Sequence, residues 1–354
     1  MPGTNLPRHS GAAKLGRAYD QDEVISALLE FEPWISYEPS IDFDFDDGVP
    51  SDTQVNSEAA LRTAVRTLAD GGAIGFFADR AEFGPRALGS RSILADPRSQ
   101  AMKDRLNEQV KRREPYRPFA PAVLAEHAHD YFDLGDDRAS PFMSFTAPSL
   151  AATATAIPAA LHIDGTARLQ TVSSDGSALR ALLELFHAET GLPILVNTSF
   201  NLAGQPIVEN PSEAITTFLD SGLDMLYLQG FIVRRKPFPA TTPTGGHQGS
   251  CLDASQRPCP GSAYRAEIVQ CSHDYEEQGG DSSSSLVQMF RLEDNHCFED
   301  KDTTLLDILR LCNGDATIGE IRKTCSDTDI VAFEQSLKTL FERRFIMFLV
   351  DSAL

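Results

Sequence analysis

The sequence predicts an α/β or α+β domain followed by a small winged-helix-like domain. From residue 56 onward, segments with apolar residues at helical spacing alternate with short apolar runs typical of strands. After a stretch rich in Pro, Gly, Ser, Gln and Thr, a second group of elements begins at residue 286. The chain of 354 residues is long enough for two or three domains. The pattern does not decide between α/β and α+β.

The first 55 residues read as a lead-in with one helix at 20–30 and an acidic linker. A domain over 56–236 follows. Its predicted helices cover 57–70, 100–112, 177–191 and 211–222, and its predicted strands cover 73–78, 117–124, 193–200 and 224–235. Since proline cannot donate a ladder hydrogen bond, the prolines of 117–124 favour an edge position for that strand.

The composition of residues 237–285 predicts a loose linker, and residues 286–354 are predicted to form the small C-terminal domain. In that domain a strand at 286–292 precedes three helices, at 304–314, 317–325 and 330–344, and a last strand at 345–350. All six cysteines lie in the last third of the chain, and none forms a CxxC pair. Their scatter favours reduced thiols over a disulfide framework, with a structural zinc site as a weaker alternative.

Charge and hydropathy restrict the class of partner. The formal net charge is −20, which repels the phosphates of nucleic acid and of anionic lipid. No apolar run approaches the ~20 residues that span a bilayer, and the N-terminus lacks the apolar core of a signal peptide. We therefore expect a cytoplasmic protein that binds neither nucleic acid nor membrane.

The strongest chemical signal is a basic cluster over residues 80–117. Ten Lys or Arg side chains stand there against five acids, and several of the arginines lie in Gly/Pro turns, GPRALGSR and ADPR. Guanidinium groups in turns suit bidentate recognition of phosphate or carboxylate. No P-loop motif occurs, so a bound triphosphate must be held by side chains. The alternative for the arginines and lysines of 100–112 is a solvated basic helix.

Two further segments carry polar groups suited to a ligand site. The apolar strand PILVNTSFN ends in Asn197 and Ser199, whose amide and hydroxyl can orient a polar ligand. The segment HIDGTARLQTV contributes His162 and Arg168. His162 is a candidate acid or base, although an isolated histidine is more often a hydrogen-bonded structural residue.

Taken together, these motifs resemble a known family. EFGPRALGSRSILADPR, MKDRLNEQVKRREPYRPFAPAVL, HIDGTARLQTV and ILVNTSFNLAGQPIV follow the order and spacing of the C-terminal domain of NodU/CmcH-type O-carbamoyltransferases. That domain is similar to YrdC, a twisted sheet with flanking helices. The resemblance implies that carbamoyl phosphate is broken down, that ATP adenylates the carbamate to carbamoyl-adenylate, and that a hydroxyl of a sugar or natural-product acceptor receives the carbamoyl group. ATP and carbamoyl phosphate are the implied substrates. Whether Mg²⁺ accompanies ATP stays open, and no metal-binding residue is predicted.

The resemblance also implies the site residues. The ligand-binding positions are Arg86, Lys111, Arg117, Arg168, Asn197 and Ser199, with Arg91 as a further candidate; Arg86, Lys111 and Ser199 are the expected catalytic groups. Two positions depart from the family pattern, because Ala78-Asp79 stand where Gln-Gly is usual and Ser90 where Asn is usual. Asp79 is thereby expected to add negative charge beside the phosphate-binding residues.

The family's preceding domain binds the acceptor, and residues 14–30 resemble the segment that joins the two domains. We therefore expect a separately encoded acceptor domain as a partner. Residues 286–354 resemble PqqD-like peptide-recognition domains, which implies a peptide partner. Two other hypotheses are a non-catalytic nucleotide-binding adaptor and an RNA-modification factor that adenylates threonylcarbamate. The acidic composition argues against the second of these.

Overall fold

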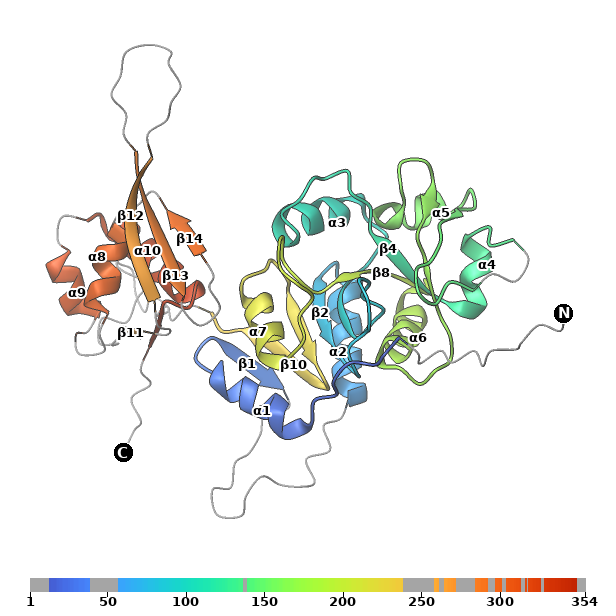
Figure 1. Ribbon diagram of the computed structural model, residues 1–354, viewed down its shortest axis with the longest axis horizontal. Coiled ribbons are helices and arrows are strands. Elements are labelled where there is room, and N and C mark those ends of the chain that lie inside the picture. Colours follow the sequence, from blue (N-terminus) through green and yellow to red (C-terminus); the bar gives the residue numbers. More distant parts are fainter. Residues whose placement is uncertain are drawn as a thin grey trace, which may run out of the picture. The chain divides into compact units, whose positions relative to one another are not determined.

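The computed structural model describes residues 13–38, 57–135 and 139–237 of the first part of the chain. Further along, it describes 258–260, 264–271, 284–291, 297–300, 304–312, 316, 318–325 and 328–348. Contacts divide the chain into two compact units, Met1–Arg235 and Lys236–Leu354. Figure 1 shows the elements of both. No helix among the described residues is long and apolar enough to cross a membrane.

The first unit is built on an eight-stranded mixed sheet. Its strands, in spatial order, are β1 (Ile35–Glu38), β10 (Phe231–Arg235), β9 (Met225–Leu228), β2 (Ala73–Phe77), β3 (Arg91–Ala95), β8 (Ile194–Ser199), β4 (Ala120–Leu124) and β7 (Gln170–Val172). The pairs β2–β9 and β4–β7 are parallel, and the other neighbours are antiparallel. Every residue of β2 and β3 is buried, as expected for central strands. The predicted mixed α/β fold is confirmed.

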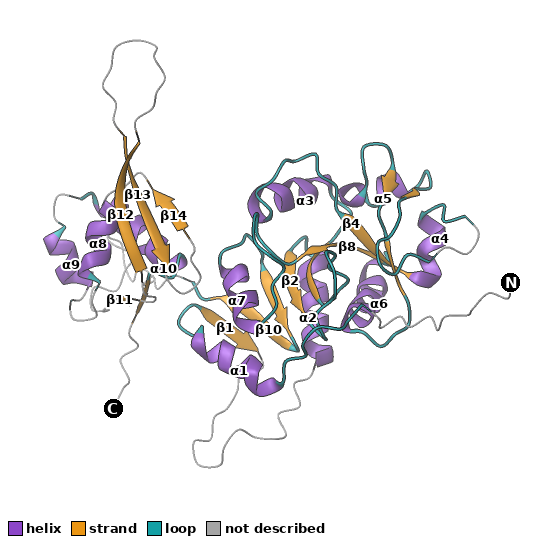
Figure 2. Cartoon of the chain, viewed as in Figure 1, coloured by secondary structure: helices purple, strands orange, loops and turns teal. Residues whose placement is uncertain are grey.

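Four helices flank this sheet (Figure 2). They are α1 (Gln21–Glu30), α2 (Ser57–Ala69), α6 (Ala178–Thr190) and α7 (Pro211–Leu219), and α2 contacts α6 while α1 contacts α7. Their first residues follow from local capping. Asp20 forms a capping box with Glu23, the Ser177 hydroxyl accepts from an N–H in the first turn of α6, and Asn210 caps α7.

Shorter elements complete the first unit. They are α3 (Gln100–Arg105), α4 (Ala128–Tyr131), α5 (Thr153–Ala156) and the two-stranded pair β5 (Ala147–Pro148) and β6 (Thr166–Ala167). The loops between these elements carry Lys111, Arg117 and His162, and Arg168 directly follows β6.

Three expectations for this unit need correction. The lead-in contains a strand, β1, which pairs with β10 at the edge of the sheet. The segment 224–235 is a hairpin rather than one strand, because Gln229 and Gly230 both have positive φ, at 45° and 97°, as a two-residue hairpin turn requires. Finally, β4 lies between β8 and β7, not at the edge. Pro121 is tolerated there because β7 pairs only from Ala122 onward.

The described residues of the second unit form two small sheets and three helices. β12 (Tyr264–Cys271), β13 (Ser284–Arg291) and β14 (Cys297–Asp300) form an antiparallel sheet, and β11 (Pro258–Pro260) pairs with β15 (Ile346–Phe348). The helices are α8 (Thr304–Leu311), α9 (Ile318–Thr324) and α10 (Ile330–Glu342), close to their predicted positions. The range 237–285, predicted as a loose linker, contains β11 and β12. That prediction is wrong for these residues, because β12 acquires its partner from β13 further along the chain.

Candidate functional site

Five of the seven predicted site residues line one cavity of about 460 Å³ in the first unit. Arg86, Arg117, Arg168, Asn197 and Ser199 come from four separate segments: the loop before β3, the loop before β4, the segment after β6 and the end of β8. The other lining residues include Arg113, Phe119, Met143 and His162. Residues up to 113 positions apart in the chain therefore meet at one hollow.

The cavity is strongly basic. Four arginines line it, Arg86, Arg113, Arg117 and Arg168, and none of the lining residues is Asp or Glu. Arg117 lies 3.8 Å from Glu114 in an exposed pair. Within the described part of the chain, Arg86 and Arg168 have no ion-pair partner. Guanidinium groups held together without acids between them suit a ligand with several negative charges.

Arg113 was missed as a site residue, and a buried asparagine explains its position. Asn107 donates to the carbonyl oxygens of Pro115 and Arg117, both at 3.1 Å, and its Oδ1 accepts from Arg113 Nε at 2.7 Å. Burial, followed by the charge of Arg117, lowers the pKa of Arg113 to about 10. The available signal was a polar residue on the apolar side of the predicted helix 100–112.

Asn197, one of the lining residues, carries a buried acceptor that has no donor among the described residues. Its Nδ2 donates to Gln170 Oε1 at 2.7 Å and to the Ala87 carbonyl at 3.4 Å. The side chain is only 1% exposed, and its Oδ1 has no hydrogen-bond partner among the described residues. A buried acceptor without a donor is costly unless a ligand supplies one. Sequence reasoning missed Gln170, which also donates to the Leu88 carbonyl at 2.8 Å and so fixes the amide orientation of Asn197.

Lys111 lies behind the cavity rather than in its lining. Its Nζ hydrogen-bonds the Ser199 carbonyl and Ser199 Oγ (3.2 Å), and the carbonyl and Oδ1 of Asn201 at 3.1 and 2.8 Å. An ammonium has three N–H groups, so at most three of these four oxygens accept at once. Burial, with the charge of Arg113 second, lowers the pKa of Lys111 to about 7.

A local irregularity of the helix directs Lys111 to this place. The predicted helix 100–112 is α-helical only to Arg105 and continues as a π-turn over Leu106–Val110. The Lys111 N–H accordingly donates to the Leu106 carbonyl, five residues back, at 2.8 Å. Such π-turns are rare and are often found at functional sites.

Arg91 lies outside the cavity lining. Its side chain is 1% exposed, lies over the Phe77 ring at 3.5 Å and donates from Nη1 to the Ala78 carbonyl at 2.8 Å. Its Nε donates to the Glu209 carbonyl at 3.4 Å. Burial lowers the pKa of Arg91, and the neighbouring Glu82 carboxylate opposes that effect. The contacts of Arg91 hold backbone together at the start of β3.

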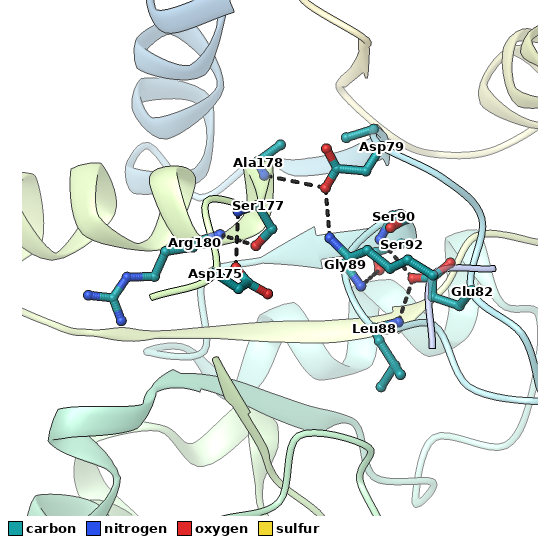
Figure 3. Close-up of polar contacts among 12 residues, drawn as sticks. Asp79, Glu82, Leu88, Gly89, Ser90, Ser92, Asp175, Ser177, Ala178 and Arg180 are labelled. Atoms are coloured by element: carbon teal, nitrogen blue, oxygen red, sulfur yellow. Dashed lines mark hydrogen bonds and ion pairs between the residues drawn. The ribbon is translucent and has the colours of Figure 1, made fainter. Parts of the chain in front are cut away.

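Asp79 does not add its charge to the arginine cavity. Its carboxylate pairs with Lys14 at 2.7 Å and accepts from the Ala178 N–H at 3.4 Å, at the first turn of α6 (Figure 3). These residues line a different cavity of about 750 Å³, which shares no lining residue with the first. The Asp79 carboxylate therefore lies apart from Arg86, Arg117 and Arg168, beside Lys14 and the N-terminus of α6, whereas its carbonyl oxygen accepts from Arg91 Nη1 at 3.3 Å.

His162 does line the arginine cavity. Its Nδ1 is 3.1 Å from Thr166 Oγ1, which also donates to Asp164 Oδ1 at 2.8 Å. Across the described residues, no group of three or more His, Cys, Asp or Glu side chains is arranged to hold a metal ion.

Comparison with known proteins assigns this region to a family. Residues 65–235 match the model of the family described as "Carbamoyltransferase C-terminus". Nodulation protein NolNO of Sinorhizobium fredii is 49% identical over 175 residues, which are 49% of this chain and 26% of that protein. NolO of Bradyrhizobium diazoefficiens is 49% identical over 183 residues, 51% of this chain and 33% of that protein. Nodulation protein U of the same organism is 39% identical over 204 residues, covering 56% of this chain and 34% of that protein.

Among solved structures, E. coli YciO is 16% identical with a TM-score of 0.36, over 51% of this chain and 82% of that one. HypF of T. kodakarensis is 12% identical with a TM-score of 0.32, over 80% of this chain and 32% of that one. The chain spans between a quarter and a third of the length of the nodulation proteins that it matches. Residues 65–235 of this chain therefore form a NodU-type carbamoyltransferase C-terminal domain.

Proposed function

We propose that this chain activates a carbamoyl group for transfer to a hydroxyl. In the proposed reaction, water cleaves carbamoyl phosphate to carbamate and inorganic phosphate. A carbamate oxygen then attacks the α-phosphorus of ATP, and pyrophosphate leaves. The products are carbamoyl-adenylate, phosphate and pyrophosphate, and the carbamoyl group then passes to a sugar or natural-product acceptor.

The observation that carries this proposal is that the guanidinium groups line one cavity together with Asn197, whose buried amide oxygen has no partner among the described residues. Arg86, Arg117 and Arg168 suit phosphate groups, which accept hydrogen bonds only. The free Oδ1 of Asn197 suits a ligand that donates, and the carbamoyl NH₂ is such a donor. A phosphate alone leaves that oxygen unsatisfied. Carbamoyl phosphate, the mixed anhydride of carbamate and phosphate, offers both acceptor oxygens and an NH₂ donor and so satisfies both kinds of group.

Two substrates with several negative charges must approach each other in this reaction. Fixed cations lower the cost of bringing them together and stabilise the charge that develops at the α-phosphate. We assign Lys111 a different role from direct phosphate binding, since its Nζ is already occupied by oxygens of Ser199 and Asn201. It holds the end of β8 so that Ser199 faces the cavity.

We place the acceptor on a separate domain or chain. The matched region is a minor part of the nodulation proteins, which supports a further domain in the complete reaction. Phe83, Tyr116 and Ile163 are 79%, 66% and 90% exposed, and each lies within two residues of a cavity-lining residue. Large exposed apolar side chains around a site are typical of a surface that a protein partner covers. Serine at all three positions should leave pyrophosphate release unchanged and abolish transfer once the acceptor domain is identified; unchanged transfer would contradict this placement.

The test is pyrophosphate release by the purified full chain. We expect release that requires both ATP and carbamoyl phosphate, and loss of it in Arg168→Ala. The matched control is Arg62→Ala, which removes an exposed arginine paired with Glu58 on α2, away from the cavity. No release by folded wild-type protein would contradict the proposal. It would favour the non-catalytic adaptor, for which Arg86→Ala and Lys111→Ala leave the biological role intact.

A further inference from the structure

We propose that Glu82 is a positioning residue for the loop that carries Arg86. One carboxylate oxygen of Glu82 accepts three backbone N–H groups: from Leu88 at 2.6 Å, from Ser90 at 2.7 Å and from Arg91 at 3.3 Å (Figure 3). The loop between Glu82 and β3 thus closes on its own carboxylate. Only the identity of the anion that Arg86 receives rests on the proposed function.

The three N–H groups depend on this carboxylate. Leu88, Ser90 and Arg91 are 8%, 0% and 1% exposed, so water cannot readily replace the lost acceptor. Each donor left buried without an acceptor loses its hydrogen bond and keeps the full cost of its removal from water. Hydrogen bonds to an ionised acceptor are roughly twice as strong as neutral ones. A neutral acceptor at position 82 should therefore stabilise the loop less than the carboxylate does. A side chain without an acceptor should stabilise the loop least of the three.

The opposite side of the loop is fixed by other residues. The carbonyl oxygens of Ala87 and Leu88 accept from Asn197 and Gln170, at 3.4 and 2.8 Å. Gly89 packs against α6, where a Cβ on it would lie 2.3 Å from a methyl of Leu179. Arg86 immediately precedes this clamped turn. Asn197 also lines the cavity, so this turn connects Arg86 to the residue that carries the unpartnered amide oxygen. Glu82 binds the N–H groups of the same turn.

Glu82 also balances a buried charge. The guanidinium of Arg91 is buried, and in the described part of the chain its Nη2 has no hydrogen-bond partner. Burial lowers the pKa of Arg91, and among the opposing influences the Glu82 carboxylate is the largest. The negative charge at position 82 therefore contributes beyond the geometry of its hydrogen bonds. Glutamine keeps an acceptor oxygen without that charge, and so separates the two contributions.

The backbone on both sides of Glu82 is held by residues that precede the family match. Gly16 N–H donates to the Ala81 carbonyl at 2.9 Å, and Phe83 N–H donates to the Ala13 carbonyl at 2.6 Å. The match begins only at residue 65. The segment 13–17 therefore fixes the position from which the carboxylate reaches the loop.

The experiment compares Glu82→Ala, Glu82→Gln and the surface control Glu58→Ala in the full chain. Hydrogen–deuterium exchange of the amides at 88–91 is measured without substrate. We expect exchange at least about tenfold faster in Glu82→Ala, a smaller increase in Glu82→Gln and no change in Glu58→Ala. Wild-type exchange at these amides in a folded Glu82→Ala protein overturns the proposal. If that variant does not fold, unchanged exchange in Glu82→Gln overturns it.

The second readout is anion binding. The KM for carbamoyl phosphate should rise at least about tenfold in Glu82→Ala, and the Kd of inorganic pyrophosphate should rise with it. A purely structural role would lower the melting temperature without changing either constant of the folded protein, and that result overturns the proposal. The exchange and pyrophosphate measurements need no turnover. If only the proposed function is wrong, the wild-type protein will release no pyrophosphate. Its loop amides will still exchange more slowly than those of Glu82→Ala.

Discussion

Lys111 should make the stability of the protein depend on pH in a predictable direction. In the folded protein, burial lowers its pKa from 10.5 to about 7. The unfolded chain exposes the side chain, so it keeps a proton up to the ordinary pKa. Between about pH 7 and 10.5, the unfolded state binds more protons, and the free energy of unfolding therefore rises with pH. Below about pH 7 both states are protonated, and this contribution is at its minimum.

The magnitude follows from the two pKa values. The slope is on the order of 1 kcal/mol per pH unit, and the full window corresponds to no more than about 5 kcal/mol. Lys111 is only 5% exposed, so solvent screens little of this effect. Other groups titrate in the same window, but they do so equally in Lys111→Met, which keeps the length of the side chain and removes the amine.

The assay is urea denaturation of wild type and Lys111→Met at several pH values from 6 to 10, under reducing conditions. We expect the free energy of unfolding of wild type, relative to the variant, to increase steadily above pH 7. A difference that stays constant across this range would show that the buried amine titrates as it does in water. It would also refute the account of Lys111 as a desolvated cation that contacts only neutral oxygens of Ser199 and Asn201.

Two further predictions concern the turn that contains Gly89 and the arginine cavity beside it. Gly89→Ala should lower the free energy of unfolding by about 2–4 kcal/mol in chemical denaturation, because its φ of 103° is strained for alanine and the new methyl meets Leu179 at 2.3 Å. Gly191→Ala, with a φ of 76° and no atom within 4 Å, is the matched control and should lose only the smaller backbone part; equal losses would contradict the collision. Inorganic pyrophosphate at about 100 times its Kd should stabilise wild type by about 2.7 kcal/mol in a thermal shift assay. Arg168→Ala should respond only at higher concentrations, and identical titrations would argue against anion binding in the cavity.

The fold of the first unit was largely accessible from the sequence because its signals are local. Apolar spacing, with Ser177 before α6 and Pro211 in the first turn of α7, predicts these two helices, and the apolar run at 73–78 predicts the central strand β2. The hairpin at 224–235 was missed because a Gln-Gly pair is a weak turn signal. The linker prediction at 237–285 failed because strand pairing with a later segment, β13, is not a local property.

The candidate site was predictable in its residue types more than in its geometry. The density of arginine in turns singled out the segment that contains Arg86, and the family resemblance added Arg117 and Arg168; the three residues do line one cavity. The sequence does not show whether the side chain of the first residue in a strand points into the core or toward a cavity. Arg91 therefore looked equivalent to Arg86, although its guanidinium is buried over Phe77. The hydrogen-bond partners of Asn107 and Gln170 could not be predicted from the sequence, because they lie in loops that only the tertiary fold brings to these amides.

The π-turn at Leu106–Val110 amounts to one extra residue accommodated within a helix. Each residue of an α-helix advances about 100° around the axis. Deleting a single residue from this turn would restore a regular helix and rotate Lys111 by about that angle, away from Ser199 and Asn201. The direction in which the Lys111 side chain points therefore depends on the number of residues in the π-turn before it. A relative with lysine in the same motif but one residue fewer before it would carry the amine on the wrong side of the helix.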